Sequence, residues 1–270
     1  MPTLPTSEEA REAVNVFTSI DVLGMLADTE LPSLGGQSVE QGIKDYYNSA
    51  LAGNPNAASL LPIAMTQPLQ SWSSTQNAFV FNPLWDMLIA MAPGQYPVFG
   101  AGDGRASAEA FFSNYVRLIA NRGDTQGWKL AVDQSDIVSD GGQDYLTQAF
   151  NLSVKAKPGQ WIRWWGNSIT PFSALQCVIG RITARTGSGD LPELENQQNL
   201  TVVYNYPSGQ NGTDSYHTAT NTAFSRMAEL KTSVPVGTKI QYNILFHMVD
   251  NQGDIIASFQ VDPEIIVIPE

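Results

Sequence analysis

The chain has 270 residues, of which 43% are hydrophobic and only 15% are charged, and it carries a formal net charge of −12. This length and apolar fraction suffice for one or two domains with a substantial core. There are only 14 Lys and Arg residues in all, and they form no run. This excludes nucleic acid and an anionic membrane as partners, because both are bound through clustered positive charge.

The start of the chain and its cysteine content bear on the compartment. No basic segment followed by an apolar one opens the sequence, which predicts no secretory signal. No apolar run reaches the roughly 20 residues that cross a bilayer. Cys177 is the only cysteine, so an internal disulfide cannot form, and this suits a reducing compartment. We therefore expect a cytoplasmic protein.

The first half of the chain mixes one strand with helices. The segment Ala13–Leu26, AVNVFTSIDVLGML, has the Val, Ile and Phe content of a strand. Apolar residues at helical spacing, with Ser38 and Pro83 as start signals, predict three helices. These cover Ser38–Leu51, Leu84–Met91 and Ala106–Asn121. The residues between the first two helices give no clean period.

Strands dominate the second half. Alternating apolar residues predict strands at Trp128–Val138, Tyr145–Ala156, Trp161–Trp165, Ala174–Ala184, Leu200–Tyr206, Lys239–Val249 and Ile255–Val261. The turn KPGQ is expected to join the second and third of these as a hairpin, and the loop DNQGD to join the last two. The tail PEIIVIPE is expected to add an edge strand.

This pattern predicts a mainly β fold. Roughly seven or eight strands separated by turns are typical of an antiparallel β-sandwich of the jelly-roll or immunoglobulin-like kind. We expect a single sandwich domain over residues 1–270, with residues 34–122 as a helical or irregular insertion between the first strand and the rest.

Three segments resemble the inclusion body protein family of bacteria, often called the AidA/PixA family. They are VNVFTSIDVLGMLADTE near the start, LSVKAKPGQWIRWWGNSIT in the middle and FHMVDNQGDIIASFQVDPEIIVIPE at the end. The sequence departs from the family pattern at Gln160, where Asp is usual, and at Val261, where Trp is usual. The resemblance covers about Val14–Glu30 and Thr125–Glu270 and leaves Leu34–Arg122 unaccounted for.

The resemblance implies a β-sandwich protein of the bacterial cytoplasm that accumulates to high levels as inclusions. The family offers no catalytic residues to carry over. We therefore expect a non-enzymatic, self-associating structural or storage protein, whose partner is another copy of itself. The alternative is a β-sandwich module that binds carbohydrate or a protein partner, in association with a secretion or toxin system.

One strand concentrates the residues that could bind something. In the stretch WIRWW, Trp161, Arg163 and Trp165 share one face, whereas Ile162 and Trp164 share the other and form the natural core pair. The first face could stack Arg163 between two indoles, present a flat platform to a sugar ring, or be covered by the inserted segment or another copy. These three residues are our candidate binding site.

Signals for catalysis or metal binding are weak. Cys177 lies in an apolar run, and His247 alternates with Leu245 and Val249, which predicts a partly buried histidine in a strand rather than a base or ligand. His217 has no partner nearby in the sequence. The acidic segments Asp136–Asp144 and Asp250–Asp254 have the Asp, Asn and Gly content of turns and match no twelve-residue Ca²⁺ loop. We expect no catalytic residue, no metal and no cofactor.

Overall fold

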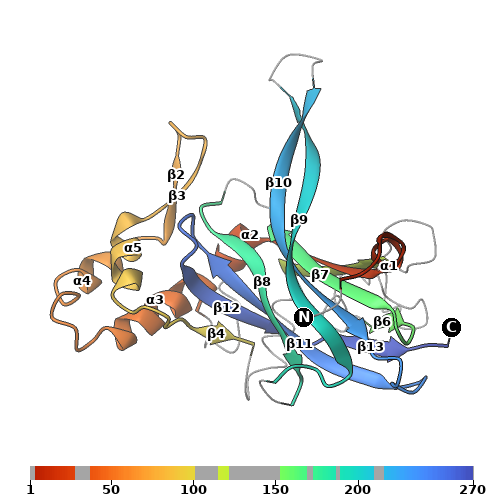
Figure 1. Cartoon of the computed structure of the whole chain (residues 1–270). Helices are drawn as coiled ribbons and strands as arrows, with labels where there is room; N and C mark the ends of the chain where they lie inside the picture. The colour runs from red at the N-terminus through yellow and green to blue at the C-terminus, as the bar shows by residue number, and fades with distance from the viewer. Residues whose placement is uncertain are drawn as a thin grey trace, which may run out of the picture.

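The chain is mainly β, and its strands form two large mixed sheets and a separate two-stranded hairpin (Figure 1). The computed structural model describes residues 4–27, 37–100, 115–121, 153–168, 173–186, 189–209 and 216–269. Among these residues, no helix combines the length and the hydropathy that a bilayer-spanning segment needs.

The first sheet has the strand order β5-β1-β7-β10-β9. Its strands are β1 (Val14–Ile20), β5 (Val116–Asn121), β7 (Trp161–Ser168), β9 (Leu194–Gly209) and β10 (Tyr216–Leu230). β1 runs parallel to β7, and the other neighbours are antiparallel. The first residue of β10 that pairs with β7 is Ser225, and the preceding part of β10, residues 216–224, forms a long two-stranded ribbon with residues 201–209 of β9.

The second sheet has the order β4-β12-β11-β13-β6, with β8 also paired to β11. Its strands are β4 (Val98–Phe99), β6 (Ser153–Ala156), β8 (Gln176–Ala184), β11 (Lys239–Val249), β12 (Ile255–Val261) and β13 (Glu264–Val267). β12 is parallel to β4, and β13 is parallel to β6. Both sheets therefore mix parallel and antiparallel pairs.

Helices α3, α4 and α5 and the small hairpin gather on one side of the sheets, whereas α1 lies on the opposite side (Figure 1). The elements outside the two sheets are α1 (Ser7–Glu12), α2 (Val22–Ala27), α3 (Val39–Ala50), α4 (Leu61–Ala64), α5 (Pro83–Ala90), β2 (Gln70–Ser73) and β3 (Ala78–Phe81). Side chains cap α3 and α5, since Ser38 accepts from the Gln41 amide and Asn82 accepts from the Leu84 amide.

One continuous core joins these helices to both sheets. Buried side chains of α3 and α5, such as Tyr47 and Trp85, belong to the same cluster as Trp164 of the first sheet and Tyr242 of the second. The Tyr47 hydroxyl shares its one proton between two acceptors, the backbone carbonyl oxygens of Gln95 at 3.1 Å and Ile256 at 3.2 Å. The helical segment thus packs on the sheets through large apolar side chains, and burial of such rings contributes strongly to stability.

Several predicted elements match the structure. The helices at Ser38–Leu51 and Leu84–Met91 are confirmed as α3 and α5, with Ser38 as the cap and Pro83 in the first turn. The hairpin closed by DNQGD is confirmed, because β11 and β12 pair on either side of it. The strand expected at Ala174–Ala184 is β8.

Three predictions about local structure were wrong. The strand at Ala13–Leu26 ends at Ile20, because the Asp21 carboxylate accepts from the Gly24 amide and starts α2. Residues 116–121, expected as the end of a helix, form β5 because β1 pairs with them along their length. Strand β10 was not predicted at all, since its sequence YHTATNTAF is rich in Thr and Asn rather than apolar.

The expected strand pairing was wrong in three places. β6 and β7 do not form a hairpin, because β6 pairs with β13 and β7 with β1 and β10; the turn between them bonds instead to Leu230, at the end of β10. The tail strand β13 lies between β6 and β11 rather than at an edge. The expected antiparallel arrangement is interrupted by three parallel pairs.

Some predictions lie outside the described residues. These are the helical residues 106–114, the strand Trp128–Val138, the first part of the strand Tyr145–Ala156 and the acidic turn Asp136–Asp144. Within the expected insertion at residues 34–122, the described part contains helices, and it also supplies β4 and β5 to the two large sheets.

Candidate functional site

The central strand β7 carries the residues expected to bind. Its side chains alternate between two faces, as the sequence predicted. Ile162 and Trp164 are fully buried in the main core, which confirms them as the core pair. Trp161 is also buried, at 3% exposure, whereas Arg163 and Trp165 are partly exposed.

Trp161 is covered by its own chain. It packs in a small separate cluster with Ala13, which precedes β1, and Met227 of β10. Leu200 of β9 adds a partly buried contact to this cluster. Trp161 therefore has almost no solvent-exposed surface with which to bind a ligand. The accessible part of the candidate site consists of Arg163 and Trp165.

Arg163 lies across the centre of the first sheet. Its guanidinium donates to Asn15 Oδ1 of β1 at 3.4 Å and contacts the sulfur of Met227 of β10 at 3.9 Å. Burial lowers the pKa of Arg163 from its ordinary value. Both contacts follow from strand register, because Asn15 and Met227 are the direct neighbours of Arg163 on the two flanking strands.

Trp165 is paired with an aromatic ring of the neighbouring strand. The ring centroids of Trp165 and Phe17 are 4.5 Å apart with the planes tilted by 48°. The two residues are opposite each other in the parallel β1–β7 pair. Together with Arg163, they form a partly exposed aromatic and cationic face on the first sheet.

His247 is a satisfied, partly buried strand histidine, as predicted. Its Nδ1 lies 2.7 Å from the Ser258 hydroxyl on β12, and the Tyr96 ring meets it edge-on with centroids 5.8 Å apart. Burial lowers the pKa of His247, so the neutral imidazole is favoured in the folded protein.

Cys177 and the two histidines do not form a catalytic group. Cys177 is buried, and burial raises the pKa of its thiol to about 12, so the thiolate that a nucleophile needs is suppressed. Cys177 lies opposite Met248 in the β8–β11 register, whereas His247 lies opposite Val178; the two therefore point to opposite faces of the sheet. His217 belongs to the other sheet, opposite Ser208.

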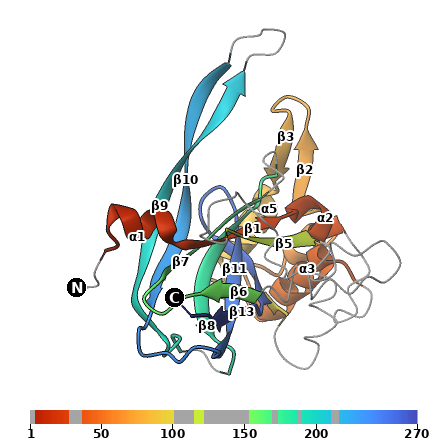
Figure 2. The same ribbon diagram turned by 90° about the vertical axis from the view of Figure 1, so that its right-hand side faces the viewer.

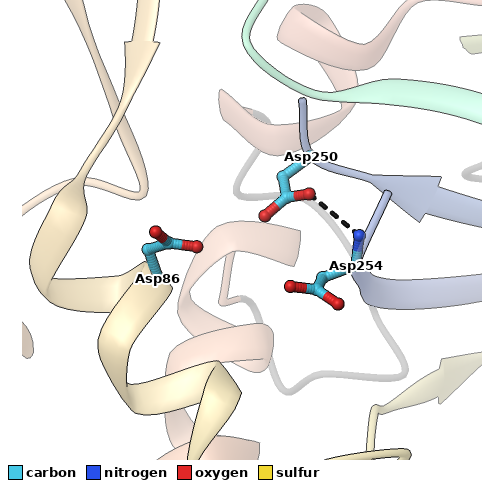
Figure 3. Close-up of side chains that lie close together, drawn as sticks. All are labelled: Asp86, Asp250 and Asp254. Carbon is cyan, nitrogen blue, oxygen red and sulfur yellow. Dashed lines mark hydrogen bonds between the residues drawn. The ribbon is translucent and has the colours of Figure 1, made fainter. Parts of the chain in front are cut away.

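A second group of side chains comes together from distant parts of the chain. Asp86 of α5 lies beside Asp250 and Asp254, which flank the β11–β12 loop (Figure 3). One oxygen from each carboxylate lies within 4.8 Å of the others. Asp250 is buried, Asp86 is partly buried and Asp254 is exposed. Carboxylate oxygens in such a group are the ligands that hard cations prefer.

The sequence pointed to two of the three residues of this acidic cluster, Asp250 and Asp254. The segment Asp250–Asp254 was expected to be a turn rather than a cation site, because it has the Asp, Asn and Gly content of turns and matches no twelve-residue Ca²⁺ loop. Asp86 lies in a helix far away in the sequence and carries no local sign of a role. Only the packing of α5 against the β11–β12 loop brings it there, together with the Gln252–Asp86 hydrogen bond of 2.9 Å.

Comparisons with known proteins add little to these observations. No family model matches the chain, and no curated protein sequence matches it significantly. Among solved structures, it is similar to the crystal structure of an inclusion body protein, PixA, from Burkholderia cenocepacia, with 94% of each chain covered, 8% identity and a TM-score of 0.38. At this level the likeness carries no argument about function.

Proposed function

We propose that this chain is a non-enzymatic, self-associating structural or storage protein of the bacterial cytoplasm, built on a β-sandwich of its two large sheets. The sandwich is supported by a contact between the sheets: Trp164 of β7 donates to the Tyr242 hydroxyl of β11 at 3.1 Å, and their rings meet edge-on. Self-association rests on a different part of the molecule.

The observation that carries self-association is the outer half of the β9–β10 ribbon. Residues 216–224 of β10, which precede Ser225, and residues 201–209 of β9 pair only with each other within the described residues. Figures 1 and 2 show this ribbon extending away from the rest of the fold. Its two outer edges are therefore rows of backbone N–H and C=O groups that a strand of another copy can pair with.

Apart from Pro207 of β9, the composition of this ribbon offers little protection against pairing. Proteins commonly guard edge strands with charged side chains, especially Lys. Residues 199–225 hold a single charged residue, Asp214, and no Lys or Arg. Val, Thr, Tyr and Phe, which favour strands, are frequent in the same segment. We therefore place the contact between copies along this ribbon.

The net charge of −12 opposes association but does not prevent it. At physiological ionic strength, charges separated by more than about 8 Å are largely screened. The contacting ribbon itself is almost uncharged, so pairing two ribbons desolvates few ionised groups.

Light scattering after size-exclusion chromatography tests this proposal. The intact protein is expected to form species larger than a monomer, in amounts that grow with concentration. Val203→Lys, which adds a charge within the ribbon, is expected to shift the distribution toward monomer. Ser59→Lys adds the same charge at an exposed position outside the ribbon and is expected to associate like the intact protein.

The comparison of the two variants separates specific pairing from general charge effects. Both lysines bring the net charge closer to zero, which by itself favours association. A loss of association in Val203→Lys alone therefore reports on the ribbon. A monomer at every concentration from about pH 4.5 to 8, or equal behaviour of the two variants, would contradict the proposal.

A second candidate function is carbohydrate or partner binding by the face that contains Arg163 and Trp165. The partly exposed Phe17–Trp165 ring pair favours it, because aromatic faces stack on apolar ring surfaces. Trp165→Ala is expected to abolish binding on a glycan array while the protein stays folded. No binding by the intact protein would dispose of this candidate.

A further inference from the structure

Three carboxylates converge where the helical segment meets the second sheet. Asp86 projects from the first turn of α5, and Asp250 and Asp254 stand at the two ends of the β11–β12 loop (Figure 3). Within the part of the chain that the structure describes, no Lys, Arg or His forms an ion pair with any of them. Like charges at this spacing repel one another, and the repulsion grows where water is excluded.

Asp250 supplies the observation that points to a ligand. The residue is 5% exposed. Its Oδ1 accepts from the backbone amides of Gln252 and Asp254, at 2.9 Å each. Its Oδ2 is buried and has no hydrogen-bond partner among the described residues. In Figure 3 this second oxygen points to the side on which the carboxylates of Asp86 and Asp254 lie.

The roles of these residues in the fold do not account for this arrangement. Asp86 in the first turn of a helix interacts favourably with the helix dipole, and Asp250 Oδ1 fixes the loop backbone. Neither role uses Asp250 Oδ2 or the carboxylate of Asp254. A buried carboxylate oxygen without a donor is costly, and two further carboxylates beside it increase that cost.

We propose that Asp86, Asp250 and Asp254 bind a hard divalent cation, Ca²⁺ in preference to Mg²⁺. A cation between them gives Asp250 Oδ2 a partner and replaces mutual repulsion by attraction. The remaining ligand positions go to water on the exposed side, where Asp254 lies. The bound cation ties α5 of the helical segment to the β11–β12 loop of the sheet.

The longer bonds and looser geometry of Ca²⁺ favour it over Mg²⁺ at this site. The three oxygens lie within 4.8 Å of one another, close enough for modest side-chain shifts to bring them around one cation at the metal–oxygen distance of about 2.3–2.6 Å that Ca²⁺ takes. Ca²⁺ also accepts the irregular geometry of a site built from a helix and a loop, whereas Mg²⁺ demands an octahedron.

Thermal unfolding of the EDTA-treated full chain tests the proposal. CaCl2 at 100-fold excess over its Kd is expected to raise Tm by about 5–10 °C, with a smaller effect of MgCl2. Tb³⁺, which substitutes for Ca²⁺, is expected to show luminescence on excitation of tryptophan, because Trp85 adjoins Asp86 in the chain. Added Ca²⁺ is expected to displace the bound Tb³⁺ and so to abolish this luminescence.

Isosteric variants assign the effect to this site. Asp254→Asn and Asp250→Asn are each expected to lose most of the Ca²⁺-dependent shift, and Asp250→Asn keeps the Oδ1 that holds the loop. Without cation, Asp254→Asn is expected to melt at or above the Tm of the intact protein, because one repulsive charge is gone. Glu195→Gln, which neutralises an exposed carboxylate on β9, is the matched control and is expected to keep the full shift.

Two outcomes would overturn the proposal. One is the absence of both a Ca²⁺-dependent Tm shift and Tb³⁺ luminescence in the intact protein. The other is an Asp254→Asn variant that keeps the same shift as Glu195→Gln, which would place any Ca²⁺ effect elsewhere. These outcomes concern the unfolding of a single chain and do not depend on whether copies associate.

Discussion

At the residue scale, Gly180 makes room for the His247 side chain. Gly180 sits at the irregularity in β8 where the register with β11 shifts. A Cβ at this position would fall well inside contact distance of the His247 imidazole. The ring cannot simply turn away, because its Nδ1 is bonded to Ser258. The absence of a side chain at position 180 is thus what lets His247 pack on the sheet.

We therefore expect Gly180→Ala to destabilise the protein by about 1–3 kcal/mol, as overpacking does. Denaturant unfolding measures this. Gly189→Ala is the matched control, since a Cβ there meets no atom of the described residues within 4 Å, and it is expected to be close to neutral. If His247→Ala leaves the cost of Gly180→Ala unchanged, the steric explanation is wrong.

The same histidine makes stability depend on pH. Burial lowers the pKa of His247 in the folded state, whereas in the unfolded state it titrates near about 6.5. Below that pH the unfolded chain binds a proton that the folded protein resists. The contribution of neutral His247 to the free energy of unfolding is therefore fully present above about pH 6.5. It is lost as the pH falls toward the lower pKa of the folded state.

Unfolding measured between about pH 5 and 7.5 checks this prediction. The free energy of unfolding of the intact protein is expected to decrease faster toward acid than that of His247→Gln. His217 and the carboxylates are present in both proteins, so the difference between the two slopes isolates His247. Parallel curves would contradict the prediction.

At the element scale, the sequence predicted those features that a single segment determines. Alternation in WIRWW identified Ile162 and Trp164 as core residues, and Ser38 located the start of α3. The predictions were wrong for segments whose structure is decided by another part of the chain. Residues 116–121 have helical spacing of apolar residues, yet β1 pairs with them and makes them a strand.

For the candidate sites, too, the sequence predicted what one segment determines and missed what depends on contacts between segments. The shared face of Trp161, Arg163 and Trp165 was predictable from their spacing. The burial of Trp161 was not, because Ala13 and Met227, which cover it, lie in other strands or just outside them. The proximity of Asp86 to Asp250 depends on how α5 packs on the second sheet, and no pattern within either segment contains that information.

The two large sheets are joined by a hydrogen bond that can be tested. Trp164 of β7 and Tyr242 of β11 are both fully buried, and the indole N–H donates to the tyrosine hydroxyl. Tyr242→Phe leaves the ring in place but removes the acceptor. Because a buried N–H then has no partner, we expect a loss of about 1–3 kcal/mol in the free energy of unfolding.

A double-mutant cycle assigns this loss to the pair. In a Trp164→Phe background, the indole N–H is already absent, so Tyr242→Phe is expected to cost much less than in the intact protein. Denaturant unfolding of the four proteins gives the coupling energy. Equal costs in both backgrounds would show that the hydroxyl acts through some other contact.

At the scale of the whole molecule, the low charge density and the net charge of −12 have opposite effects on association between copies. Sparse charge leaves surfaces such as the β9–β10 ribbon easy to desolvate. The net negative charge keeps copies apart through repulsion that salt screens and that protonation of carboxylates removes. Association is therefore expected to increase as the pH falls toward the pI of about 4.5 and as salt is added near neutral pH.

Light scattering at constant protein concentration checks this, with pH and NaCl varied separately. Isoelectric precipitation of any acidic protein would give the same pH trend, so the trend alone decides nothing. The decisive comparison uses Val203→Lys and Ser59→Lys, which have the same net charge and therefore the same general repulsion. If the ribbon mediates contact, Val203→Lys associates less at every pH and salt concentration, and the gap between the two variants persists in high salt, where repulsion is screened. A gap that closes in high salt would mean that the added lysine acts through its charge alone.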